Sequence, residues 1–169
     1  MKARMAKQDP QEMIARARER AMDRLLDTGV ELSTSPKPMS YVVDPSVRAK
    51  APISGANGKV VVKRGQVVNP LDYISLHKDL VVFDGTDPRQ VDQVEQWTAS
   101  KGPLLLAATA LPKKTEARQA MQKRLGTTIH MANGWVIRRL AIKAIPALLE
   151  QDGRMLRITI PEDGGGGAS

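Results

Sequence analysis

The sequence predicts an α/β domain: a mixed β-sheet with helices on both faces, preceded by an N-terminal helix. Two short, continuous apolar runs, 80–83 and 104–108, predict strands that are buried on both sides. Helical patterns follow both runs, and residues 147–158 predict a closing hairpin. With 169 residues, 41% of them hydrophobic and 3% aromatic, the chain can bury one core built from aliphatic side chains.

The first predicted element is a helix over 11–27, a segment rich in Ala, Arg, Glu and Met. Asp9 can cap its start, with Pro10 at the first helical position and Glu12 as the capping-box partner. Gly29 stands just beyond its end, where a left-handed cap is expected.

The apolar stripe of this helix is narrow. A stripe this thin suits packing on one neighbour, either in this chain or in another, and both alternatives stay open. The Ser- and Pro-rich segment 33–40 predicts an extended, semi-rigid spacer after it. We therefore expect a helix and linker over 1–40 and the main domain over 41–163. The stripe consists of Ile14, Ala17, Ala21 and Leu25.

Valine-rich segments open the main domain. Lys59–Lys63 and Val67–Val68 surround a Gly65 turn and predict a small N-terminal hairpin. The pair Asn69-Pro70 is expected to end it, because proline cannot donate a hydrogen bond to a sheet.

A strand followed by a capped helix is the most strongly patterned part of the chain. Leu80–Phe83 predicts a central strand, adjacent to Leu104–Ala107. Asp87 is then expected to cap a helix over 87–100, with Gln90 completing a capping box. This helix is expected to face the sheet through Val91, Val94 and Trp97.

The second half predicts a further helix, a short strand and the hairpin. Thr115–Leu125 should be a helix that ends at Gly126 and turns Ala117, Met121 and Leu125 inward; Thr127–Met131 should be a strand. Asn133-Gly134 predicts a turn, and 135–142 is ambiguous between helix and strand. The hairpin pairs 147–150 with 154–158 across Asp152-Gly153.

Several of these segments also share their order with a known family. In this order and spacing, over roughly residues 41–160, they resemble TraW, a pilus-assembly protein of F-type conjugative type IV secretion systems. The resemblance implies a thioredoxin-like fold, a periplasmic location, and secretion-system partners similar to TrbC and TraU. The segments are Tyr41-Val42-Val43-Asp44-Pro45, Val68-Asn69-Pro70-Leu71-Asp72, Phe83-Asp84-Gly85, Asp87-Pro88-Arg89-Gln90-Val91 and Ile145-Pro146-Ala147-Leu148-Leu149.

The chain has 0 Cys, so its own side chains cannot carry out thiol–disulfide chemistry. In a thioredoxin-like framework, the place of the reactive pair is held by residues 84–88, where plain helix capping accounts for Asp87. The resemblance implies a cis bond before Pro146. We therefore expect a binding protein without enzymatic activity or cofactor. Its expected interaction surface comprises Ile14, Ala17, Ala21, Leu25, Gly85, Asp87, Ile145 and Pro146.

Other site types find little support. Asp84 and Asp87 lack the further ligands or the cleft that a metal or glycosidase site needs. His77 and His130 do not have metal-ligand spacing, and we expect each to be a surface or half-buried residue. The glycines at 55 and 58 lack the third glycine of a nucleotide-binding loop.

The net charge of +8 makes a basic nucleic-acid-binding module the alternative function. The cations are scattered, and no aromatic residues are interleaved with them for base stacking, which favours a solvated basic surface. A peptide-binding chaperone is a third, weaker alternative.

The ends of the chain are expected to be disordered. Residues 1–9 have no periodicity, and 164–169 read as a flexible glycine tail or an appended sequence. No apolar run approaches the length of a membrane span, and no signal core follows the early basic residues. Periplasmic export would therefore require that a leader had been removed, or that export works otherwise.

Overall fold

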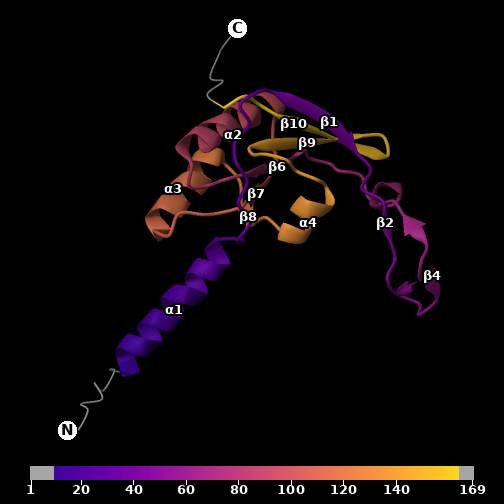
Figure 1. The fold of residues 1–169 in the computed structure, drawn as a ribbon, viewed down its shortest axis with the longest axis horizontal. Coiled ribbons are helices and arrows are strands. Elements are labelled where there is room, and N and C mark those ends of the chain that lie inside the picture. Colours follow the sequence, from indigo (N-terminus) through magenta and orange to yellow (C-terminus); the bar gives the residue numbers. More distant parts are fainter. Residues whose placement is uncertain (1–9, 164–169) are drawn as a thin grey trace.

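The structure, a computed structural model that describes residues 10–163, is built around a six-stranded mixed sheet (Figure 1). The strand order is β1-β10-β9-β6-β7-β8. The expected Asp9 cap, the disorder of 1–9 and the tail 164–169 lie outside the described residues, as does the Glu12 side chain. The sheet strands are β1 (Met39–Val43), β6 (Leu80–Phe83), β7 (Leu105–Ala108), β8 (Ile129–Met131), β9 (Ala147–Asp152) and β10 (Met155–Ile160).

The sheet has a parallel half and an antiparallel half. Strands β6, β7 and β8 run parallel, and β6 and β7 are adjacent as predicted, with Val81 opposite Leu106. On the other side of β6, strands β9, β10 and β1 are antiparallel to their neighbours. The predicted closing hairpin is thus confirmed, and its turn contains Gly153 with a left-handed φ of 62°.

Helices cover both faces of the sheet, as the sequence predicts. On one face, α2 (Pro88–Lys101) and α3 (Thr115–Leu125) bury Val91, Val94 and Met121 against the sheet, and Trp97 is partly buried there. The other face is covered by α4 (Gly134–Arg139) and by neighbouring segments. The buried members of both clusters are aliphatic apart from Met121 and Phe83, and Phe83 is fully buried.

Two details of the second half differ from the prediction. Ala117 of α3 is exposed, so this helix contacts the core mainly through Met121 and Leu125 near its end. Asn133-Gly134 begins α4 and does not form a hairpin turn, because the Asn133 side chain accepts a hydrogen bond from the Trp135 backbone N–H and caps the helix. The ambiguous segment that follows is therefore a short helix.

The segment between β1 and β6 forms a projecting arm, defined here as residues 47–68 (Figure 1). The predicted hairpin around Gly65 is wrong. The arm turns instead near Gly58 and folds back on itself in two small ribbons, β2 with β5 and β3 with β4. Their bounds are β2 (Val47–Arg48), β3 (Ile53–Ser54), β4 (Val60–Val62) and β5 (Val67–Val68).

Helix α1 (Pro10–Leu26) projects away from the sheet (Figure 1). The segment after it is not a spacer clear of the domain: residues 28–35, which we call the strap, cross the surface of the sheet layer and bury Ser35. Val30 and Leu32 of the strap pack against the core cluster beneath α4. Residues before position 40 therefore contact the domain as well as those after it, so the predicted boundary near residue 40 does not separate a free linker from the domain.

Candidate interaction site

The strap crosses the ends of β6 and β7 and the loop before β9, where the expected interaction surface lies. Backbone hydrogen bonds hold it along its length. Thr28 N–H donates to the carbonyl oxygen of Thr109 at 2.9 Å, and Ile145 N–H donates to that of Ser33 at 3.1 Å. Asp163 N–H donates to the carbonyl oxygen of Ser35 at 2.7 Å. The strap is thus bound as an extended peptide, at three separate places.

The strap covers part of the surface that the sequence analysis selected. Ile145 is 1% exposed and Pro146 is buried, and the bond between them is cis, as predicted. Gly85 is also buried, and Asp87 is half-buried. The structure therefore brings these four residues to one region, but it leaves little of Ile145 and Pro146 open to a partner while the strap is in place.

The loop after β6 requires glycine at position 85. A Cβ atom there would lie 2.8 Å from the carbonyl oxygen of Ala110 and 3.0 Å from Leu111 Cδ2. The Gly85 N–H donates to the same Ala110 oxygen at 2.9 Å. This close approach joins the loop after β6 to the loop after β7. The start of the strap lies against these loops, where Thr28 bonds to Thr109.

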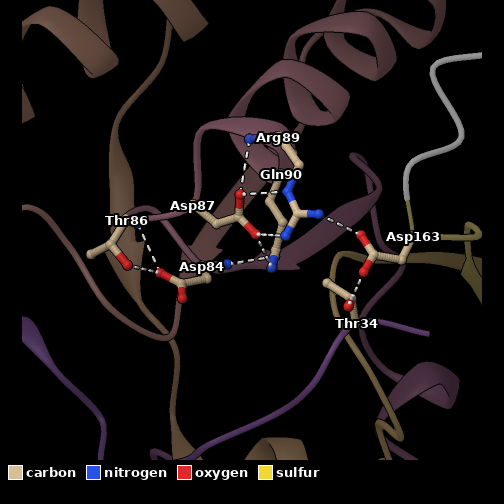
Figure 2. Close-up of polar contacts among 7 residues, drawn as sticks. All are labelled: Thr34, Asp84, Thr86, Asp87, Arg89, Gln90 and Asp163. Carbon is tan, nitrogen blue, oxygen red and sulfur yellow. Dashed lines mark hydrogen bonds and ion pairs between the residues drawn. The ribbon is translucent and has the colours of Figure 1, made fainter. Parts of the chain in front are cut away.

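Asp87 caps α2, as predicted. Its carboxylate accepts a hydrogen bond from the Arg89 backbone N–H at 3.0 Å and is 3.3 Å from the Arg89 guanidinium (Figure 2). Partial burial raises the pKa of Asp87, but the hydrogen bonds and charge of Arg89 outweigh it and leave the pKa below its usual 3.8. The carboxylate is therefore held in its charged form at the helix N-terminus.

The predicted capping box does not form. The Gln90 side chain points toward the loop after β6, where its amide oxygen accepts from the Asp84 N–H at 2.8 Å (Figure 2). Gln90 is 4% exposed, so this buried contact couples the first turn of α2 to the end of β6. Asp84 itself accepts hydrogen bonds from the backbone N–H and hydroxyl of Thr86.

A polar clasp closes over the far end of the strap (Figure 2). The Arg89 guanidinium donates to one Asp163 oxygen at 3.0 Å, and the Thr34 hydroxyl donates to the other at 2.7 Å. We call Thr34, Arg89 and Asp163 the clasp. It joins three segments that are distant in sequence: the strap, the first turn of α2 and the chain after β10.

Strap residues line two cavities. One, of about 250 Å³, is lined by residues including Thr34, Asp87 and Pro146. The other, of about 500 Å³, is lined by residues including Leu32, Asp84 and Ile145. The walls are rich in carboxylates, although the whole chain has a net charge of +8. These are Asp23, Asp27, Glu31, Asp84, Asp87, Asp92, Glu162 and Asp163.

Helix α1 leaves this face at a defined point. The Leu111 N–H donates to the carbonyl oxygen of Leu26 at 2.8 Å, and Lys113 Nζ lies 2.9 Å from the Asp23 carboxylate. The helix nevertheless exposes most of its apolar side chains, including Ile14 at 51% and, beside this contact, Leu25 at 66%. Ala17 and Ala21 are exposed as well. All four predicted stripe residues are therefore open to a partner.

Sequence reasoning missed the strap and the clasp. Val30-Glu31-Leu32-Ser33 alternates apolar and polar residues, which is the signal of an extended segment with one buried side. The neighbouring Pro36 and Pro38 favoured a spacer instead. Nothing local marks Thr34 or Asp163, because their roles depend on contacts across the whole chain.

Metal chemistry finds no support in the described part of the chain. Within residues 10–163, no group of three or more His or carboxylate side chains is placed to hold an ion. His77 and His130 are both exposed, as expected.

None of the helices within residues 10–163 is both long and apolar enough to span a membrane.

Comparison with known proteins gives one informative similarity. Protein TraW of Escherichia coli (strain K12) is 32% identical to this chain over 111 residues. The chain is similar to TraW. The aligned part covers 64% of this chain and 50% of TraW, so the chain spans about half the length of this curated relative. No protein-family model matches the chain, and no solved structure matches it.

Proposed function

We propose that this protein is a non-enzymatic assembly factor of a conjugative type IV secretion system, required for pilus assembly and DNA transfer, and that it acts in the periplasm. The similarity to TraW carries the proposal. Its mechanism is protein–protein contact, because the chain has 0 Cys and the candidate site holds a capped helix start where a thiol pair would stand.

We further propose that the domain is thioredoxin-like. The order β10-β9-β6-β7, with β6 parallel to β7 and antiparallel to β9, supports this assignment. Helix α2 follows directly after β6, and the Ile145–Pro146 bond precedes β9. In this proposal the strap occupies the face that an active member of the fold would offer to its substrate.

The proposed partners are other proteins of the secretion apparatus, similar to TrbC and TraU. The surface best suited to them is the exposed stripe of α1, because small Ala17 and Ala21 between Ile14 and Leu25 allow another helix to approach closely. The Asp23–Lys113 ion pair and the hydrogen bond from the Leu111 N–H to Leu26 join the end of α1 to the segment after β7.

Deletion of the gene in a donor cell that carries the whole transfer apparatus tests the proposal. We expect loss of surface pili and of plasmid transfer, both restored by the full chain supplied in trans. A variant with Ile14→Asp and Leu25→Asp should fail to restore them, whereas Met13→Gln, a control on an exposed apolar residue outside the stripe, should succeed. Normal pili and transfer in the deletion strain would overturn the proposal.

Affinity purification of the full chain from the same cells, followed by mass spectrometry, tests the partner class. Secretion-system proteins should be recovered with the full chain and lost with the double variant. Recovery of nucleic acid without any of these proteins would favour the basic nucleic-acid-binding alternative.

A further inference from the structure

We propose that the arm, residues 47–68, binds an extended acidic segment of a partner protein, which adds as a further strand to one of its ribbons. The arm lies outside the candidate site and at a distance from α1 (Figure 1). The inference therefore concerns a second interaction surface, and it does not depend on which apparatus the protein serves.

Charge is the first observation. The arm carries five cations, and the sequence contains no Asp or Glu from residue 45 to residue 71. The net charge of the entire chain is +8, so a large share of it lies on this one projecting element. A surface with cations alone attracts an acidic partner and repels a basic one. The cations are Arg48, Lys50, Lys59, Lys63 and Arg64.

Exposed aliphatic side chains are the second observation. Ile53, Val60, Val61 and Val67 are between 53% and 61% exposed, although all are branched residues that favour packed strands. They lie in β3, β4 and β5, and the cations lie in β2 or in the segments that connect the arm strands. A purely solvated basic loop has no need of such residues, so the arm offers apolar contact area together with its charge.

Unpaired strand edges are the third observation. Each arm strand pairs with a single neighbour, β2 with β5 and β3 with β4, so each ribbon has two strands in the described structure. Two-stranded ribbons are marginal in water, and their outer backbone N–H and C=O groups are open to another chain. Addition of a strand would pair these groups and cover the exposed valines at the same time.

The base of the arm is fixed to the domain, so the arm is presented in one place. Asn69 is 4% exposed and donates its side-chain N–H to the carbonyl oxygen of Arg154 at 2.7 Å. The Arg154 guanidinium also makes two contacts of 2.7 Å with the Asp72 carboxylate. Among the arm residues, all of which the structure describes, Val62 alone is buried, with 6% of its surface exposed.

A protein segment suits the arm better than nucleic acid or a membrane. The arm has no aromatic residue on which bases could stack. Insertion into a bilayer would place its open backbone edges in hydrocarbon, where unpaired polar groups are costly. An acidic strand with aliphatic side chains satisfies the charge, the apolar surface and the edges together.

The test uses the full chain and a short fluorescent peptide of alternating valine and glutamate, with a valine–lysine peptide as its counterpart. We expect saturable binding of the acidic peptide and none of the basic one. Charge reversal at Lys59, Lys63 and Arg64, each to Glu, should weaken binding by at least about tenfold. The matched control reverses Lys114, Lys123 and Arg138 outside the arm and should bind as the unaltered chain does.

Hydrogen exchange read by mass spectrometry tests strand addition. Bound peptide should slow exchange of backbone amides within the arm strands and leave the strands of the main sheet unchanged. Peptide binding that is equal in both charge-reversal variants, or that leaves the arm amides unprotected, would overturn the proposal. Tighter binding of duplex DNA or of anionic phospholipid vesicles than of the peptide, lost in the arm variant alone, would also overturn it.

Discussion

The backbone N–H of Ile145 donates to the carbonyl oxygen of Ser33 at 3.1 Å, which joins the loop before β9 to the middle of the strap. Ile145 is 1% exposed while the strap is in place, so water does not compete for this hydrogen bond. An intramolecular hydrogen bond of this kind contributes about 0.5–1.5 kcal/mol to stability. The strap therefore belongs to the stable fold of the domain, although it lies directly after a projecting helix.

The clasp should control how firmly the far end of the strap is held. Asp163→Ala removes the acceptor of both Arg89 and Thr34 and should speed hydrogen exchange of the strap amides. Global stability should fall by no more than about 1 kcal/mol, because exposed ion pairs contribute little. Exchange is measured by mass spectrometry on 28–36.

Arg157→Ala is the matched control for the clasp, since it breaks an exposed ion pair with Asp152 far from the strap. Strap exchange should stay unchanged in this variant. Equal acceleration in both variants would show that the clasp has no specific role in holding the strap.

Helix α1 should contribute little to the stability of the domain. Ile14→Asp with Leu25→Asp places charges on side chains that are already 51% and 66% exposed, so no core contact is lost. The melting temperature should stay within about 2 °C of the unaltered chain, while partner binding is abolished. A fall of about 5 °C or more, by calorimetry, would place the helix in the cooperative core.

The contact beneath Gly85 should make this position sensitive to a single methyl group. Gly85→Ala places a Cβ 2.8 Å from the Ala110 carbonyl oxygen, and the two loops must separate to accommodate it. We expect a loss of about 1–3 kcal/mol in denaturant unfolding. At Gly55, where a Cβ meets its neighbours at 3.4 Å, the same substitution should be close to neutral. Similar losses at both positions would contradict this account.

Capping by Asp87 should show in the pH dependence of stability. Asp87→Ala should cost about 0.5–2 kcal/mol at neutral pH, and Asp87→Asn should recover most of this, because Asn is also a good cap. The folded-state pKa of Asp87 lies below 3.8, so its charged form stabilises the fold fully above 3.8. This contribution is lost as the pH falls through the lowered folded-state pKa.

The measurement is unfolding by urea from pH 7 down to pH 3. The difference between the unaltered chain and Asp87→Ala should be constant at neutral pH and should shrink only at the acidic end of the series. A difference that grows as the pH falls would have the wrong sign for a carboxylate whose pKa is lowered by folding.

The central strand and the helices that pack on it could be predicted from the sequence, because each is specified by residues within or next to it. The continuous apolar run at Leu80–Phe83 can be buried only between two layers, and the Asp87-Pro88 cap sets where α2 begins. The boundaries of α3 were predicted correctly because Gly126 has a left-handed φ of 66°, which glycine adopts without strain.

The turn of the arm and the packing of the strap could not be predicted from local sequence patterns, because both depend on contacts with residues elsewhere in the chain. Gly58 and Gly65 both have positive φ, so either could have made the hairpin turn, and pairing with Ile53 and Val47 decided in favour of Gly58. In the strap, Val30 and Leu32 pack against the core, and the carbonyl oxygens of Ser33 and Ser35 accept hydrogen bonds from Ile145 and Asp163. These long-range contacts cannot be read from the two prolines that follow. Of the expected surface residues, those on α1 are exposed, whereas Ile145 is covered by a segment taken for a linker.

The position of β1 in the sheet determines how early in synthesis the domain can fold. Strand β1 pairs with β10, and the strap receives hydrogen bonds from Ile145 and Asp163, so these early residues find their partners near the other end of the chain. At the usual pace of synthesis, roughly 6–24 s separate the emergence of residue 40 from that of residue 160. Throughout that interval the nascent segment has its backbone groups unpaired and its valines uncovered, which opens a window for a chaperone or export factor to bind it first.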